Sequence, residues 1–357
     1  MIETMPPQAP PGLSPWRRRL GTWLAQPLFW PLLTLALLLV GNGLLNPGFL
    51  ALQWRDGHLY GNLVDIANRA APLALVSLGM TLVIAVRGLD ISVGAVLAMA
   101  ATVAVWTIGH RSGDGLAPLF LAIAAALATG MVCGLWNGLL VARVGMQPIV
   151  ATLVLMVAGR GIAQLLGGGQ ILTVYYSPYS FLGNGFLLGL PFSLFVVAFA
   201  FALLHGLLGR TALGLFVRSI GHNPLAAHVA GVRARTITIA AYVVCALTAA
   251  TAGLLVSSNV SSADANNAGL LLELDAILAV ALGGTALGGG RFRLAGSLVG
   301  ASIIQTLTTT IYAVGVPPQV NLVVKAVLVF VVMLLQSAEF RAWVRGLPMS
   351  LQRKSQP

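Results

Sequence analysis

The chain has 357 residues, of which 58% are hydrophobic and 8% are charged, and its mean hydropathy is +0.91. Soluble domains carry about 25% charged residues, so this composition excludes a soluble globular protein and indicates an integral membrane protein. The net charge of +11 does not indicate a nucleic-acid partner, because the basic residues are scattered between apolar runs.

The transmembrane elements are predicted from apolar runs of about 17 to 25 residues. After the polar segment 1–27 comes a run that is too long for a signal-peptide core and has no clear cleavage site, so we interpret it as an uncleaved first span. The expected fold is all-α, a polytopic membrane protein with about ten transmembrane helices. The spans lie near residues 28–46, 68–86, 90–109, 116–142, 147–167, 188–208, 237–258, 273–289, 294–315 and 318–336.

Some details of these spans predict local structure. Only Arg87–Leu89 separates the second span from the third, which predicts a tight turn. The eighth span is short and rich in glycine, so we expect a broken or partly re-entrant helix. Glycines 130, 134 and 138 repeat every fourth residue and predict close helix packing. Cys133 and Cys245 lie in apolar runs and are expected to be buried free thiols.

The distribution of basic residues predicts the orientation. If the N-terminus is inside, fifteen of the twenty basic residues fall in inner segments, and only Arg55, Arg69 and Arg111 fall outside. Cytoplasmic loops carry such an excess of arginine and lysine, so both ends of the chain are expected inside. The organisation is then a cytoplasmic tail over 1–27, a transmembrane domain over 28–336 and a cytoplasmic tail over 337–357.

The longest inner loop covers residues 209–236. Asn223 is a good N-cap, Pro224 suits the first helical turn, and Gly231 is a natural C-cap, so a short helix is expected over 225–230. Its alanines would let another protein approach closely. The alternative is a helix that lies on anionic lipid without a protein partner.

Three stretches resemble a known family. "GHNPLAAHVAGV" (221–232) is similar to the coupling-loop signature of ABC importer permeases, which is Glu-Ala-Ala, three residues and Gly, although Leu225 stands in place of the Glu. "RGLDISVGA" (87–95) and "ELDAILAVALGGTALGGGRFRLAGSLVGA" (273–301) resemble motifs of the ribose/xylose/galactose branch, with Phe292 in place of a usual Gly. The resemblance covers about residues 60 to 336 and is nearest to the galactofuranose-type subgroup.

The resemblance implies a permease subunit of an ATP-driven monosaccharide importer in the bacterial inner membrane. Two copies would form the pathway, an ABC ATPase would bind inside, and a periplasmic sugar-binding protein would deliver the sugar. The chain itself is expected to be neither an enzyme nor a cofactor carrier. Its lysines, Lys325 and Lys354, do not follow the glycine of a P-loop, so ATP and magnesium would belong to the ATPase subunit. The implied ATPase contact comprises Gly221, Asn223, Pro224, Leu225, Ala226, Ala227, His228 and Gly231.

The other candidate residues allow more than one interpretation. Asp90 or Ser92 could cap the third span, or Arg87 and Asp90 could belong to an inner gate or to the ATPase-facing surface. Glu273 and Asp275 are expected at the outer mouth, either solvated or facing the binding protein. Gln305, Thr306, Thr308, Thr309 and Lys325 are candidates for the translocation path. Neither a catalytic group nor a metal site is expected.

Two alternative functions remain open from the sequence. A permease for branched-chain amino acids shares the same architecture. An ion-coupled secondary transporter usually places carboxylates near the membrane centre. Here all nine acidic residues are expected at span ends or in loops, which favours the ATP-driven class.

Overall fold

The computed structural model describes residues 28–46, 48–55, 57–110, 115–315 and 318–336. The tails predicted over 1–27 and 337–357 lie outside these residues, as do Asp56, Arg111 and Asp114. The described chain is largely helical, and each of the ten predicted spans contains one apolar helix.

The helices that correspond to the predicted spans have the following bounds. They are α2 (Phe29–Leu45), α3 (Asn62–Ala85), α4 (Val93–Gly109), α5 (Ala117–Leu139, continued by the π-helical turn η1, Leu140–Val144), α6 (Pro148–Leu166), α8 (Phe192–Arg210), α11 (Ala234–Asn259), α12 (Leu272–Leu282), α13 (Leu294–Ala313) and α14 (Pro318–Gln336). Within the described residues, six of them are long and apolar enough to cross a membrane: α3, α5 with η1, α6, α8, α11 and α13. The chain is therefore a polytopic membrane protein.

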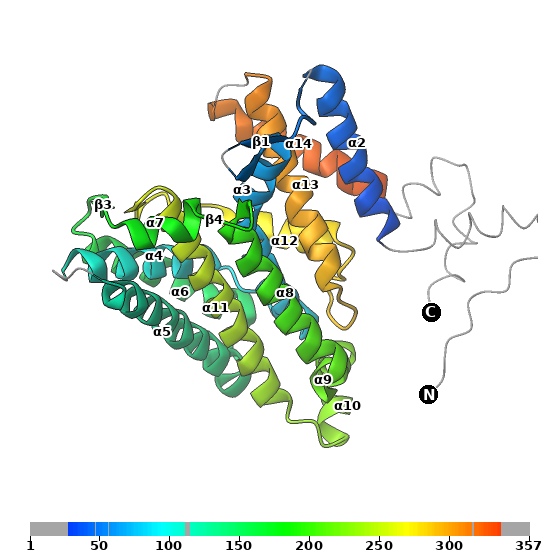
Figure 1. Ribbon diagram of the computed structural model, residues 1–357. Helices are drawn as coiled ribbons and strands as arrows, with labels where there is room; N and C mark the ends of the chain where they lie inside the picture. The colour runs from blue at the N-terminus through cyan, green and yellow to red at the C-terminus, as the bar shows by residue number, and fades with distance from the viewer. Residues whose placement is uncertain (1–27, 47, 56, 111–114, 316–317, 337–357) are drawn as a thin grey trace, which may run out of the picture.

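Short strands join some of the helices at one end of the molecule (Figure 1). Strands β1 (Gln53–Arg55) and β2 (His58–Tyr60) form a hairpin, as do β4 (Phe186–Leu187) and β5 (Leu190–Pro191), while β3 (Leu172–Thr173) pairs antiparallel with β6 (Ser262–Ala263). The two hairpins touch, because the Leu59 N–H donates to the Gly189 carbonyl at 2.8 Å. We call this the hairpin end. These strands are the only departure from the all-α expectation among the described residues.

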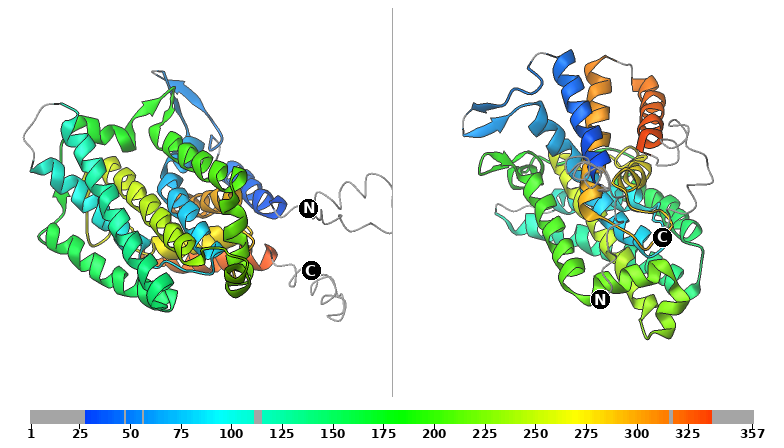
Figure 2. Two further views of the ribbon diagram at one scale, coloured as in Figure 1. Left: turned by 90° about the horizontal axis from the view of Figure 1, so that it is seen from below. Right: turned by 90° about the vertical axis from the view of Figure 1, so that its right-hand side faces the viewer.

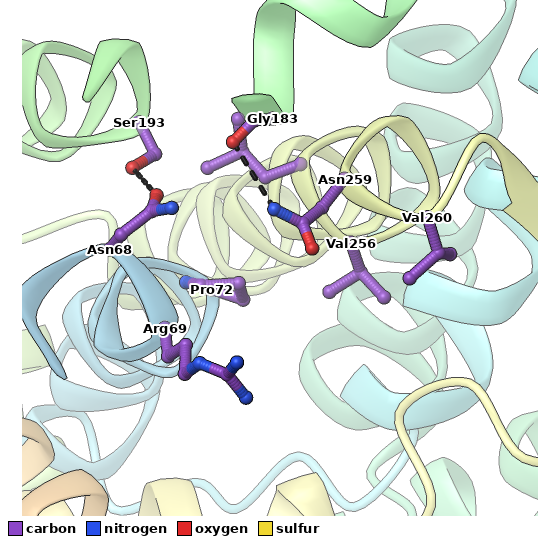
Figure 3. Close-up of a pocket in the computed structure, with 9 residues that line it drawn as sticks. Asn68, Arg69, Pro72, Gly183, Ser193, Val256, Asn259 and Val260 are labelled. Carbon is purple, nitrogen blue, oxygen red and sulfur yellow. Dashed lines mark hydrogen bonds between the residues drawn. The ribbon is translucent and has the colours of Figure 1, made fainter. Parts of the chain in front are cut away.

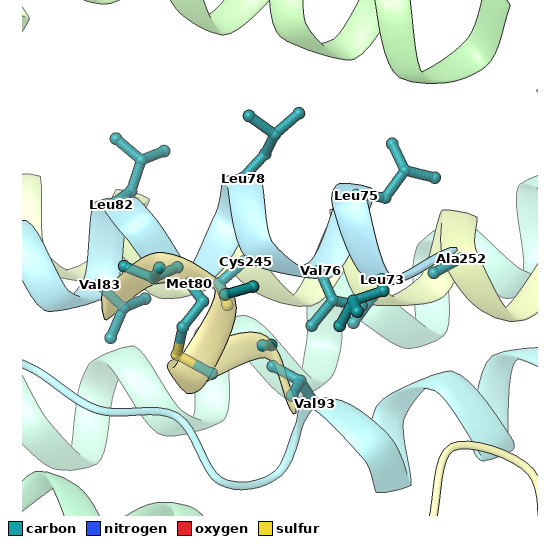
Figure 4. Packing of buried hydrophobic residues seen from close by; sticks show 14 of the residues in the cluster. Leu73, Leu75, Val76, Leu78, Met80, Leu82, Val83, Val93, Cys245 and Ala252 are labelled. Atoms are coloured by element: carbon teal, nitrogen blue, oxygen red, sulfur yellow. The ribbon is translucent and has the colours of Figure 1, made fainter. Parts of the chain in front are cut away.

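Helix α3 lies at the centre of the bundle. In its most apolar stretch 78% of the residues are buried, compared with 11% for α8, so α3 is enclosed by protein while α8 lies at the surface of the bundle. Figure 4 shows Val76, Met80 and Val83 of α3 on the side that faces Val93 of α4, while Leu75, Leu78 and Leu82 point to the other side. A helix that is apolar on all sides is expected to be enclosed in this way. Both cysteines are free and buried, as predicted.

Glycines bring the helices into backbone contact. A Cβ atom on Gly134 of α5 would lie 2.6 Å from the Val243 Cα of α11, and one on Gly300 of α13 would lie 1.9 Å from the Ala279 oxygen of α12. No side chain fits at either position, so the small residues set the helix spacing. The packing role predicted for glycines 130, 134 and 138 is confirmed, since all three face α11.

Helices α2, α13 and α14 form a separate side of the bundle. Helix α13 contacts α2 and α14, and these three lie away from α5 and α6 in the views of Figure 1 and Figure 2. Helix α12 lies between this group and α3. It has only 11 residues and is followed by the non-helical segment 283–293, so the expected break in the eighth span is confirmed.

The connection between the second and third spans differs from the prediction. Helix α3 ends at Ala85 and α4 begins only at Val93, so residues 86–92 form a longer connection than the tight turn expected. Arg87 has a φ of +63°, after which the chain is non-helical up to Ser92. Asp90 and Ser92 are both 0% exposed. A buried, irregular backbone of this kind needs polar partners inside the protein.

Candidate functional site

The end opposite the hairpins carries two short helices, α9 (Ala212–His222) and α10 (Pro224–Val229) (Figure 1). The Asn223 side-chain oxygen accepts from the N–H groups of Leu225 and Ala226 at 3.0 and 3.1 Å, and Pro224 occupies the first turn. Gly231 follows the helix with a φ of +84°, a conformation that favours glycine. The short capped helix predicted in this loop is therefore confirmed.

Helix α10 has one buried face and one exposed face. Leu225 is 73% exposed and Val229 is 82% exposed, whereas Ala227 is 4% exposed and belongs to the hydrophobic core together with Val217 and Ile220 of α9. The expectation that Ala227 and Gly221 are part of a contact surface is wrong, because both face into the protein. The other predicted contact residues are exposed: Asn223, Pro224, Leu225, Ala226, His228 and Gly231.

Arg87 joins the α3–α4 connection to the end of α9. Its Nε donates to the Gly221 carbonyl at 2.7 Å, and its Nη2 donates to the His222 carbonyl at 2.6 Å. The last carbonyl groups of a helix lack partners within the helix and carry partial negative charge, so a guanidinium is well suited to bind them. Arg87 therefore binds the helix that leads directly into α10.

The segment after α12 reaches the same point. The Gly290 N–H donates to the Ala85 carbonyl at 3.0 Å. A Cβ atom on Gly221 would lie 2.0 Å from the Ala85 oxygen and 2.2 Å from the Gly290 nitrogen, so the three backbones touch. We call these contacts of residues 85–87, 221–222 and 289–290 the junction. It brings together the three stretches that carry the family resemblance.

Phe292, which stands in place of a usual Gly of the family motif, also contributes a contact near the junction. The Arg218 guanidinium of α9 lies 5.4 Å from the centre of the Phe292 ring. A cation over an aromatic face is attracted to it by about 0.5–1 kcal/mol at exposed sites. Phe292 therefore adds a link between α9 and the segment after α12.

Asp90 lies in a buried hydrogen-bond cluster. Its Oδ1 accepts from the Ser92 N–H at 2.9 Å and from the Ser92 hydroxyl at 2.6 Å, and the Asn137 amide of α5 donates to the Ser92 hydroxyl at 2.9 Å. Neither side chain caps α4, and Asp90 is buried, so the cap and the ATPase-facing surface are both wrong for Asp90. A place in an inner gate stays a prediction. The carboxylate instead closes a local turn, a role for which aspartate is well suited.

Glu273 and Asp275 occupy different environments. Glu273 is 3% exposed, so it is not solvated at a mouth as expected. A Cβ on Gly94 would lie 2.4 Å from its Oε2, which places the carboxylate against the start of α4, where a negative charge is favourable. Asp275 pairs with Lys325 of α14 at 2.5 Å, with side-chain exposures of 23% and 16%.

The path candidates on α13 bind their own helix. The hydroxyls of Thr306, Thr308 and Thr309 donate to carbonyl groups one turn earlier, at 2.7, 2.9 and 3.0 Å. Thr306 is buried, and Gln305 is partly buried beside it. These threonines keep acceptor capacity but have used their donors, so the helix satisfies them without a ligand.

Polar residues in the first turns of α3, toward the hairpin end, were missed from the sequence. Asn68 and Arg69 line a cavity of about 180 Å³ together with Ser193 of α8 and Asn259 of α11. The signal was present, because Asn62, Asp65 and Arg69 recur at helical spacing at the start of an otherwise apolar helix. Periodicity alone did not show what would pack around them.

The comparisons with known proteins agree with this arrangement. The profile of the family described as branched-chain amino acid transport system / permease component matches residues 62–333. The chain is 47% identical to the galactofuranose transporter permease protein YtfT of Escherichia coli K12, over 96% of this chain and 98% of that protein. It is 36% identical to the fructose import permease protein FruF of Bifidobacterium longum, over 93% of this chain and 92% of that protein.

A ribose permease is also similar to the chain. The chain is 36% identical to the ribose import permease protein RbsC of Bacillus subtilis, over 85% of this chain and 91% of that protein. No solved structure matches the chain at a significant level. The extent of these matches, together with the three motifs joined at the junction, shows that the chain belongs to the family of branched-chain amino acid transport system permease components, which are transport subunits and not enzymes.

Proposed function

We propose that this chain is the membrane-spanning subunit of an ATP-driven importer for a monosaccharide of the galactofuranose type. The observation that carries the proposal is the 47% identity to a galactofuranose permease along nearly the whole length of both chains. Permeases named for fructose and ribose are also similar, whereas only the family description mentions amino acids. This pattern favours a sugar over a branched-chain amino acid as the transported molecule.

We propose that the chain crosses the bacterial inner membrane ten times and that both of its ends lie on the cytoplasmic side. The segments expected inside by their charge, around Arg87, 209–236 and 283–293, meet at the junction. The hairpins, which were expected outside, touch each other at the opposite end. Helices α2, α4, α12 and α14 would then be the four further spans beside the six longer ones, and α12 would cross only part of the bilayer.

The ATPase subunit is proposed to bind the exposed face of α10. Leu225 and Val229 lie one turn apart on this face and present an apolar pair to the solvent side. Such a pair fits an apolar groove on a partner protein and replaces the acidic contact that the family signature would provide. ATP and magnesium would be held by that partner, because this chain contains no P-loop sequence.

Motion of the ATPase would reach the interior through the junction. A shift of α10 displaces the C-terminus of α9, which Arg87 and Gly290 tie to the ends of α3 and α12. The same connection continues through Asp90 into α4. Packed backbones move together and do not deform gradually, so three helices around the bundle centre would change position as one unit.

The remaining partners follow from the importer class. Two copies would form the pathway between them, surrounded by lipid, with the candidates Gln305 and Thr308 of α13 among its polar groups. The sugar-binding protein would dock at the hairpin end, where Trp54 is 67% exposed. Glu273 would not take part in that contact because it is buried, whereas Asp275 would do so only if its pair with Lys325 opened.

Reconstitution of the complete transporter tests this proposal. The chain is co-purified with its ATPase and binding protein from the native host, incorporated into liposomes, and supplied with radiolabelled D-galactose, D-fructose, D-ribose or L-leucine. We expect uptake of a sugar that requires both ATP and the binding protein. Uptake of leucine instead, or sugar uptake driven by an ion gradient without the ATPase, would contradict the proposal.

A further inference from the structure

The cavity beside the outer third of α3 is bounded by four helices (Figure 3). Its volume is about 180 Å³, and its lining includes Asn68 and Arg69 of α3, Ser193 of α8 and Asn259 of α11. Gly183 of α7 (Ser177–Asn184) also lines the cavity. Protein cavities of about 150 Å³ hold a six-membered ring. The space is therefore sufficient for a monosaccharide ring that enters from one side.

Neighbouring groups hold the two amide side chains of the cavity in defined orientations. The Ser193 hydroxyl donates to the Asn68 oxygen, which leaves the Asn68 amide nitrogen as a donor. The Asn259 nitrogen donates to the Gly183 carbonyl at 3.3 Å and to the Asn184 oxygen at 2.9 Å, which leaves the Asn259 oxygen as an acceptor. The cavity thus offers one oriented amide donor and one oriented amide acceptor.

Arg69 adds a stronger donor, and the rest of the wall is apolar. The Arg69 side chain extends from α3 into the open part of Figure 3 and has no ion-pair or hydrogen-bond partner among the described residues. Pro72, Leu255, Val256 and Val260 complete the lining. A guanidinium presents parallel N–H groups, which match two adjacent hydroxyl oxygens. Apolar walls with a few oriented polar groups are typical of small-molecule sites.

We infer that this cavity is a transient subsite for the hydroxyl groups of a neutral sugar on the outer side of the transport path. The inference rests on the proposed function, because it names where the imported sugar first contacts the permease. The side chains that line it include no carboxylate, so the cavity lacks the anion that the ammonium group of an amino acid needs. A neutral polyol satisfies the donors and the acceptor without bringing a charge of its own.

The same face of α3 continues outward to a second cavity. Asn62 and Asp65, which precede Arg69 by about two turns and one turn, line a space of about 240 Å³ together with Gln53 and Tyr60 of the first hairpin. Polar groups therefore follow one side of α3 from the hairpin end inward. A sugar that leaves the outer cavity would meet the Arg69 cavity next.

Protection of an introduced cysteine tests the inference. Both native cysteines are buried, so Val260→Cys places an accessible thiol on the cavity wall without removing a polar contact. The matched control is Tyr175→Cys, at a residue that is 95% exposed and does not line the cavity. The permease–ATPase complex is reconstituted without the binding protein and labelled with a membrane-impermeant maleimide, with and without D-galactose, D-fructose or D-ribose at millimolar concentration.

We expect the sugar that the wild-type transporter imports to slow labelling of Val260→Cys several-fold and to leave labelling of Tyr175→Cys unchanged. In the Val260→Cys background, Arg69→Gln should raise the sugar concentration needed for half-protection about tenfold, and Arg69→Lys should raise it less, because lysine keeps the charge but not the paired donors. Co-purification of each variant with the ATPase subunit shows that it has folded.

Other outcomes would overturn the inference. If an imported sugar gives no protection, the cavity is not on its path, although the proposed function stands. In a further arm the sugar-free binding protein is added; if that protein slows labelling and the sugars do not, the cavity is part of a protein docking surface. If the wild-type transporter imports none of the sugars, the proposed function fails and the subsite fails with it.

Discussion

The junction and the hairpin end are built in opposite ways. At the junction three backbones touch, and a single added carbon on Gly221 would lie 2.0 Å from the Ala85 oxygen. At the hairpin end two cavities of about 180 and 240 Å³ are lined in part by polar side chains, among them Asn68 and Asn62. A tightly packed contact transmits displacement, whereas an open polar cavity admits a solute. The two ends should therefore respond differently to substitution.

The largest effect is expected from Gly221→Ala. The new Cβ would meet the backbone atoms of Ala85 and Gly290, which cannot move aside as a flexible side chain could. We expect ATP-driven uptake to be almost abolished, with a loss of about 1–3 kcal/mol in stability. Uptake in liposomes and thermal unfolding in detergent measure the two effects. Gly206→Ala on α8 is the control, because nothing lies within 4 Å of its Cβ, and equal uptake by both variants would refute the tight junction.

Tryptophan substitutions at the two alanines of α10 should separate folding from docking. Ala226 is exposed, so Ala226→Trp should leave the fold intact and prevent ATPase binding. Ala227 is 4% exposed, so Ala227→Trp should disrupt the packing of α10 and lower the unfolding temperature as well. ATPase co-purification and thermal unfolding distinguish the two. Normal ATPase binding by Ala226→Trp would show that this face of α10 is not the docking surface.

Arg87→Gln should weaken the coupling between ATP hydrolysis by the ATPase and sugar import by the permease. Its effect on uptake should be smaller than that of Gly221→Ala. The variant loses the hydrogen bonds that the Arg87 guanidinium donates to the carbonyl groups of Gly221 and His222. We expect ATP hydrolysis to continue while the sugar imported per ATP falls several-fold. Arg87→Lys should restore part of the coupling, and Arg235→Gln, on the exposed start of α11, is the matched control. Unchanged coupling in Arg87→Gln would remove Arg87 from the transmission route.

The smallest effects are expected at the pair formed by Asp275 and Lys325. Lys325→Met or Asp275→Leu alone leaves one charge without its partner in apolar surroundings, whereas the double variant leaves none. The double variant should therefore be more stable than either single variant, with a coupling energy of about 0.5–3 kcal/mol. Thermal unfolding measures this cycle. A double variant that unfolds normally but does not import sugar would instead make Lys325 a path residue.

The sequence predicted the features that depend on neighbouring residues. The cap of α10 is an example, because Asn223, Pro224 and Gly231 act within a few positions of one another. Apolar length likewise located the apolar helices of the described residues, and the glycines of the eighth span marked where α12 ends. These signals are local, so one sequence is sufficient to identify them.

Features that depend on distant segments were not predictable in the same way. Arg87 binds Gly221 across 134 positions, and Lys325 binds Asp275 across 50. Ala227 and Glu273 are buried because other segments pack on them, although a surface position was expected for both. The sequence marked these residues as unusual, but their partners are set by the arrangement of the helices.

Cross-linking from α10 tests the central claim most directly. A photoreactive amino acid replaces Leu225, which is 73% exposed, or Tyr175 as the control, which is 95% exposed near the opposite end. After illumination of native-host membranes, cross-linked partners are identified by mass spectrometry. We predict that a P-loop ATPase is captured from position 225 and not from position 175. Capture of no ATPase from position 225, or capture from position 175 instead, would contradict both the docking surface and the proposed orientation.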